Sequence, residues 1–302
     1  MIEVKKKYDI GFVILQYGRS DLTRDCIESI GTYVKDAKKL IVIVDNHSPD
    51  DSLQDIREWY RKKEDVIILE TKENLGFARG NNLGYAYARN LCDFLCILNS
   101  DVLLTQNNFW QILKESYEEN QFALAGPYIY LPNMNQPELL MVGIGSLEFE
   151  KKELKRKKVY EKLVHMGLNP LREKLGELKR RIRKKDAQKL KPDEKILREP
   201  HENIVLNGCC LFYSPLYLDR YEDAFDPRTF FYGEERLLYL RLYKDGLKSF
   251  YEPRLSVLHL KFGSTQEQKI AKEKMYFQWQ QTIIAQKLLL ETLEKMNWRG
   301  TD

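Results

Sequence analysis

The chain has 302 residues, of which 43% are hydrophobic and 31% are charged. This composition is sufficient for the core of a large α/β domain and excludes a disordered chain. Because no run of about 18 apolar residues occurs, a membrane-spanning helix is also excluded. The net charge of +4 conceals a basic segment: residues 150–200 contain 19 Lys and Arg against nine Asp and Glu.

Four short apolar runs have the pattern of strands buried on both faces of a sheet: residues 10–15, 40–44, 66–69 and 94–98. Amphipathic helical patterns lie between them, at residues 21–34, 52–63 and 81–91. This alternation predicts an α/β fold with a Rossmann-like, mostly parallel sheet and helices on both faces.

The later part of the chain is less regular. Helical patterns occur at residues 108–120 and 234–245, and strand-like runs at 123–130, 203–213 and 249–259. Residues 266–297 predict a long amphipathic helix or a pair of helices, whose apolar positions serve core packing, a homodimer contact or a membrane contact.

The five cysteines, an odd number, are expected to be reduced thiols of a cytoplasmic protein. The short, charged N-terminal segment does not have the pattern of a signal peptide.

Polar segments follow all four predicted strands of the first hundred residues. In an open α/β sheet the carboxyl ends of the strands collect ligands. We therefore expect a binding site at this edge, and the later segments contain further polar motifs that could join it.

Seven of these motifs occur in the order found in family 2 glycosyltransferases of the GT-A fold: VDNHSPD (44–50), NLGFARGNN (74–82), LNSDV (98–102), NGCCLF (207–212), FDP (225–227), FFYGEE (230–235) and HLKFGST (259–265). The chain resembles bacterial rhamnosyltransferase-like members in particular. The resemblance implies a nucleotide-sugar-binding half (1–147) and an acceptor-binding, catalytic half (203–265). A basic helical insert (148–202) and a C-terminal helical extension (266–302) lie outside it.

The resemblance implies a Mn²⁺ or Mg²⁺ site, because the diphosphate that leaves a sugar nucleotide needs electrostatic stabilisation. Asp101 occupies the position of a metal ligand, and Asn99 replaces the first Asp of the family's Asp-x-Asp motif and would face the donor. His259 heads a motif that supplies a metal or diphosphate contact. The alternatives are that Asp101 caps the helix beginning near Gln106 or simply ends a turn, and that His259 is a structural hydrogen-bonding residue.

Further positions are expected to bind the donor. Asp45 follows a buried strand and can accept the ring N–H that uracil and thymine share, with Tyr17 bordering the base. By resemblance, the remaining donor-binding positions are Asn74, Gly76, Arg79 and Asn82. A solvated side chain is the alternative for Arg79.

Glu234 and Glu235 align with an acidic pair that contains the family's general base. The second member is the usual base, which favours Glu235, with Glu234 binding the acceptor or orienting its neighbour. The alternative is an acidic first turn of a helix, which the helix dipole favours. The resemblance also implies inversion at the anomeric carbon in a single displacement.

The leading hypothesis is an inverting, metal-dependent hexosyltransferase. It would move a sugar from a UDP- or dTDP-sugar to a glycan or lipid-linked saccharide in cell-surface polysaccharide synthesis. The basic insert is either a peripheral contact with an anionic membrane at the inner face of the cell or a solvated helical region. No nucleic-acid-binding module is present. A nucleotidyltransferase and an inactive transferase-fold adaptor are the other functional readings.

Overall fold

We describe the protein from a computed structural model that covers residues 6–140, 143–168, 196–261 and 272–300. Most of the second half of the predicted basic insert lies outside the described residues, as does the start of the predicted terminal helix.

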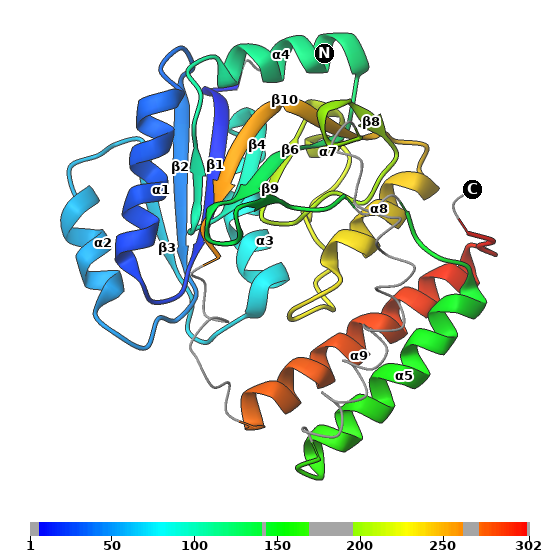
Figure 1. Cartoon of the computed structure of the whole chain (residues 1–302). Helices are drawn as coiled ribbons and strands as arrows, with labels where there is room; N and C mark the ends of the chain where they lie inside the picture. The colour runs from blue at the N-terminus through cyan, green and yellow to red at the C-terminus, as the bar shows by residue number, and fades with distance from the viewer. Residues whose placement is uncertain (1–5, 141–142, 169–195, 262–271, 301–302) are drawn as a thin grey trace.

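The first hundred residues form the predicted parallel arrangement (Figure 1). Strands β1 (Tyr8–Gln16), β2 (Lys39–Asp45), β3 (Val66–Glu70) and β4 (Cys92–Asn99) pair in parallel in the order β3-β2-β1-β4. Helices α1 (Ser20–Tyr33), α2 (Ser52–Tyr60) and α3 (Gly76–Ala88) connect them. The α/β prediction is confirmed, although α3 begins five residues earlier than its sequence pattern indicates.

The later strands continue the same sheet beyond β4 in the order β9-β6-β10-β5. Strand β9 (Cys210–Tyr213) is antiparallel to both β4 and β6 (Leu124–Leu131), whereas β6 and β10 (Ser249–His259) are parallel. The short strand β5 (Val102–Leu104) ends the order; β7 (Gln136–Pro137) pairs with β6, and β8 (His201–Glu202) with β10.

The predicted strand at 203–213 is wrong for its first seven residues. Asn203 has a left-handed backbone with φ of 55°, and the Asn207 side chain accepts the Cys209 amide at 2.9 Å. These local interactions keep the segment out of the β-ladder, so only Cys210–Tyr213 pairs with other strands.

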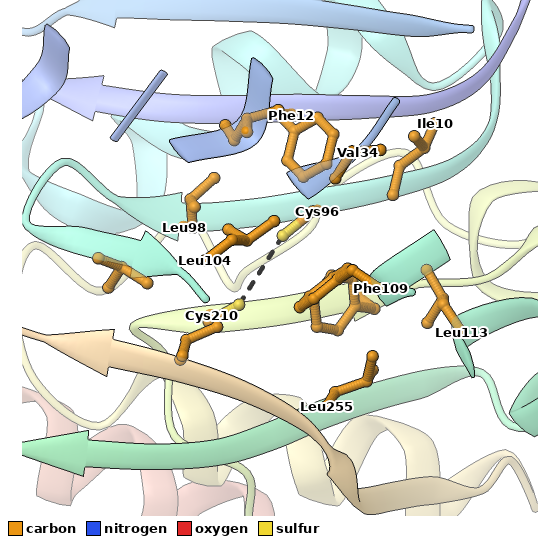
Figure 2. Close-up of a cluster of buried hydrophobic side chains, with 14 of the residues drawn as sticks. Ile10, Phe12, Val34, Cys96, Leu98, Leu104, Phe109, Leu113, Cys210 and Leu255 are labelled. Atoms are coloured by element: carbon orange, nitrogen blue, oxygen red, sulfur yellow. Dashed lines mark hydrogen bonds between the residues drawn. The ribbon is translucent and has the colours of Figure 1, made fainter. Parts of the chain in front are cut away.

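Two hydrophobic cores cover the two faces of the sheet. Helices α1, α2 and α4 (Phe109–Asn120) bury their apolar sides in the first core, while α3, α7 (Pro215–Leu218) and α8 (Glu234–Lys244) do so in the second. Figure 2 shows part of the first core, where the sulfur atoms of Cys96 and Cys210 lie 3.9 Å apart. All five cysteines are buried and free, as predicted.

A third core attaches a pair of helices, distant from each other along the chain, to the body of the protein. Helices α5 (Leu147–His165) and α9 (Lys272–Lys295) pack along each other below the sheet in Figure 1, and apolar side chains of α9 contact α8. Two short 3₁₀ helices, Pro132–Met134 and Ile196–Arg198, complete the described elements. No helix in the described ranges is long and apolar enough to cross a membrane.

Candidate active site

Strand pairing brings together the two predicted metal ligands. His259 ends β10, and its register partner on the antiparallel strand β5 is Val102, the residue after Asp101. His259 Nε2 lies 3.4 Å from Asp101 Oδ1, and the Asp101 side chain is almost completely buried. Helix α4 begins at Phe109 with Asn108 as its N-cap residue, so the alternative role of Asp101 as a helix cap is excluded.

The chemistry of this pair fits a divalent cation. A carboxylate oxygen beside an imidazole nitrogen is a donor set that Mn²⁺ accepts. The second ring nitrogen, His259 Nδ1, is buried and has no hydrogen-bond partner in the described part of the chain, whereas Nε2 lies beside the Asp101 carboxylate. No group of three or more His, Cys, Asp or Glu side chains forms a metal site within the described ranges. Substrate phosphates and water would therefore supply the remaining ligands, as they do in many Mg²⁺ sites.

The predicted base lies near the same edge of the sheet. Cys209 precedes β9, and its carbonyl accepts the amide of Asn99 at 2.8 Å. Burial raises the pKa of the Cys209 thiol, and the negative charges around it, including those of Asp101 and Glu235, raise it further. Because Glu235 lies against Gly208, and the adjacent Cys209 bonds Asn99, the predicted base is close to the segment that contains Asp101.

The two glutamates at the start of α8 occupy different environments. Glu234 is buried, and burial together with the charge of Glu235 raises its pKa to about 8. Glu235 is only partly buried, and a Cβ placed on Gly208 would lie 2.7 Å from its Oε1. Burial also raises the pKa of Glu235, against the opposing effects of the backbone amides of Glu235 and Gly208. Although both residues lie in the first turn of a helix, they are not a solvated acidic turn.

Glu235 lines a cavity of about 410 Å³, whereas Glu234 does not. The cavity lies between the segments 138–139 and 205–207, the start of α8, and the helices α5 and α9. Its polar lining includes Glu138, Lys157, Asn207, Tyr232, Glu235 and Arg236. A hydroxyl group bound here can reach the Glu235 carboxylate. Lys157 belongs to the basic run that sequence reasoning assigned to the insert, and nothing in that run distinguishes it from its neighbours.

Asp45 braces the loop that follows β2. Its Oδ1 accepts the hydroxyl of Ser48 at 2.5 Å, its Oδ2 accepts the Ser48 amide at 3.1 Å, and the Ser48 hydroxyl in turn accepts the Gly18 amide at 2.9 Å. Because a carboxylate has about four acceptor positions, Asp45 keeps capacity for a further donor. Tyr17, beside Gly18, exposes 41% of its surface and so borders this loop with a free ring face.

Two asparagines join the loops after β2 and β3. Asn46 Nδ2 donates to Asn74 Oδ1 at 3.0 Å, and Asn46 Oδ1 accepts the Leu75 amide at 2.8 Å. Asn74 Oδ1 also accepts the Gly76 amide at 2.9 Å. The Asn74 side chain therefore organises the start of α3. Asn74 itself is exposed at the edge of the sheet where the strands end.

Gly76 and Asn82 contact the later half of the chain. Gly76 has φ of +75°, and a Cβ there would lie 2.3 Å from the Phe230 carbonyl oxygen, so only glycine fits. The Asn82 amide donates to the Phe225 carbonyl and accepts the Phe225 amide, both at 2.9 Å. Both positions therefore join the two halves of the fold, a role that the sequence pattern did not indicate.

Arg79 is exposed on the first turns of α3. Its Nε donates to the Leu75 carbonyl at 3.3 Å, a contact within its own helix, and no ion pair to another described residue accompanies it. The guanidinium is thus available for a ligand. Its exposure contrasts with the Asn82 side chain, which is buried.

The buried Glu234 should make the stability of the protein depend on pH. Its folded-state pKa of about 8 exceeds the ordinary value of 4.5, so its contribution is complete below about pH 4.5 and is lost as the pH rises through about 8. We expect the melting temperature of the wild type to fall over this range more steeply than that of Glu234→Gln, measured by calorimetry. Glu58→Gln, an exposed control, should keep the wild-type slope. Equal slopes for all three proteins would contradict the assignment.

Comparisons with known proteins identify the family and the fold. The sequence profile of glycosyl transferase family 2 matches residues 12–171. The fold is similar to that of a mannosyltransferase, PcManGT from Pyrobaculum calidifontis in complex with GDP-Man and Mn²⁺ (TM-score 0.53, 12% identity, 97% of this chain and 74% of that chain). It is also similar to S. aureus TarS 1-349 in complex with UDP-GlcNAc (TM-score 0.52, 12% identity, 93% and 66%).

The chain spans 60% of the TarS 1-349 chain without ligand, at 13% identity and a TM-score of 0.51. No curated protein matches the sequence. At these identities the structural likeness supports the fold alone.

Proposed function

This chain belongs to glycosyl transferase family 2, and from that premise we propose that it is an inverting transferase that uses a UDP- or dTDP-sugar. Two contacts support the proposal: His259 lies beside Asp101, a pair that would bind a cation, and Glu235, which lines a cavity, lies against Gly208 in the segment that bonds Asn99. The first half of the chain would bind the donor and the second half the acceptor.

The donor would bind along the carboxyl edge of the first four strands. Asp45 has the remaining acceptor capacity to take the ring N–H of the base, with Tyr17 beside it, and the exposed Arg79 is free to approach the diphosphate or the sugar. Asn74 and Asn99 lie at the same rim. Gly76 and Asn82 would act indirectly, by holding this edge against the later half.

Asp101 and His259 would hold a Mn²⁺ or Mg²⁺ ion. When bound, the ion supplies positive charge that stabilises the departing diphosphate. The carboxylate provides a hard oxygen donor, and the imidazole provides a nitrogen donor from the neighbouring strand. Asn99, uncharged, would contact the donor without adding to the charge at the site.

Glu235 would be the general base that takes the proton of the acceptor hydroxyl as it attacks the anomeric carbon. Of the acidic pair, only Glu235 faces the cavity. Glu234, whose pKa is about 8, is mainly protonated at neutral pH and is therefore unsuited to this role. One displacement by the acceptor inverts the anomeric centre.

The acceptor would be a glycan or a lipid-linked saccharide of a cell-surface polysaccharide. Helix α5 supports a peripheral contact with an anionic membrane, because its exposed surface combines Lys and Arg residues with the apolar side chains of Phe149 and Val159. Such a contact would bring the cavity close to a membrane-bound acceptor.

The direct test is to incubate the chain with UDP-, dTDP- and GDP-sugars in the presence of Mn²⁺ and to measure the nucleoside diphosphate released. We expect release from a uridine or thymidine donor, and none after chelation of the metal. Transfer of a nucleotidyl group instead of diphosphate release would show a nucleotidyltransferase and would overturn the proposal. An inactive fold would release nothing from any donor.

A further inference from the structure

The cavity beside Glu235 is lined by two cations from different helices. Lys157 comes from α5, and Arg236 follows Glu235 on α8. None of the predicted donor residues lines this cavity, and neither Asp101 nor His259 does. A ligand held by these two cations would therefore belong to the acceptor side of the reaction.

Two acidic groups at the cavity, Glu138 and Glu150, already have ion-pair partners, and the third, Glu235, is the proposed base. Arg236 forms an ion pair with the buried Glu150, which also accepts the Gln286 amide at 2.7 Å. Glu138 pairs with Lys261 at 2.7 Å. These two pairs leave Lys157 as the cation whose charge they do not balance.

Lys157 has only a neutral hydrogen-bond partner in the described part of the chain. Its Nζ donates to Gln286 Oε1 at 2.6 Å, and no ion pair joins it to a carboxylate there. An ammonium group has three donors, so two remain for a ligand. Arg236 Nε is likewise buried without a hydrogen-bond partner among the described residues.

The titration of Lys157 reflects this imbalance. Burial and the positive charge of Arg236 together lower its pKa to about 8, against the opposing effect of the Glu150 and Glu153 carboxylates. Two cations that face one cavity repel each other, and a bound anion would remove that repulsion and satisfy the unused donors.

We propose that the acceptor carries an anionic group, a phosphate or a carboxylate, which Lys157 and Arg236 bind while Glu235 receives the proton of a nearby hydroxyl. The inference rests on the proposed function insofar as it takes the cavity to be the acceptor site. The shared chemistry is a set of negatively charged oxygens on a saccharide. The phosphate of a lipid-linked or phosphorylated sugar and the carboxylate of an acidic sugar both provide it.

The test compares the binding of three sugars that differ in charge to the whole chain: glucose, glucuronate and glucose 6-phosphate. Dissociation constants are measured in phosphate-free buffer for the wild type, Lys157→Gln and Lys158→Gln. Lys158 is the matched control, an exposed lysine on the same helix that does not line the cavity. Melting temperatures confirm that each variant is folded.

We expect at least one charged sugar to bind the wild type about tenfold more tightly than glucose, a difference of about 1.4 kcal/mol. Lys157→Gln should lose this preference and Lys158→Gln should keep it. The stronger of the two charged sugars identifies phosphate or carboxylate as the group recognised. Equal binding of all three sugars to the wild type, or an unchanged preference in Lys157→Gln, overturns the proposal.

Donor turnover separates this result from the proposed function. Nucleoside diphosphate release without acceptor should be the same in Lys158→Gln and in the wild type, because Lys158 is exposed and does not line the cavity. If the protein prefers charged sugars but never releases nucleoside diphosphate, the anion site is supported and the proposed transferase function is wrong. Turnover without a charge preference would reject only the anion site.

Discussion

Replacing Glu235 by glutamine is expected to lower the rate of sugar transfer by about 10²- to 10⁴-fold, the usual contribution of a general base. Glutamine keeps the size of the side chain and its position against Gly208, but it cannot take a proton from the acceptor hydroxyl. Donor affinity should change little, because Glu235 lines the cavity and not the edge of the first four strands. Steady-state transfer kinetics, together with titration of UDP or dTDP, measure both quantities.

Glu234→Gln is the matched control for this prediction. Because Glu234 is mainly protonated at neutral pH, glutamine resembles the form that the protein already contains, and most of the transfer activity should remain. If Glu234→Gln abolishes transfer and Glu235→Gln does not, the assignment of the base is reversed.

The second large effect is expected for Asp101→Asn. The substitution preserves shape but removes the negative charge beside His259, so affinity for Mn²⁺ should fall and metal-dependent donor turnover should drop by about 10²-fold or more. Diphosphate release as a function of Mn²⁺ concentration measures the activity. The paramagnetic resonance signal of free Mn²⁺ measures binding independently of turnover.

Asp25→Asn serves as the control for this substitution, since Asp25 is an exposed carboxylate on α1. It should bind Mn²⁺ and turn over donor as the wild type does. Unchanged Mn²⁺ affinity in Asp101→Asn would remove this residue from the metal site and with it the main electrostatic argument for the reaction.

Local patterns in the sequence were sufficient for the first half of the fold. Apolar runs such as residues 10–15 and 40–44 predict buried strands because a strand covered on both faces needs hydrophobic residues at every position. The polar segment after each run then lies at one edge of the sheet, and the family resemblance implies the roles of Asp45 and Asp101 within these segments. The strand positions could be predicted because they depend on neighbours along the chain.

Other features depended on contacts between segments that are distant along the chain. Sequence patterns do not encode the pairing of β10 with β5, which sets His259 beside Asp101, or the burial that distinguishes Glu234 from Glu235. The same holds for Asn82, whose side-chain amide bonds the backbone of Phe225, and for Lys157, which lines a cavity and bonds Gln286 whereas Lys158 is exposed. Residue type and spacing are properties of the chain, whereas burial, charge balance and pKa arise only when distant segments pack together.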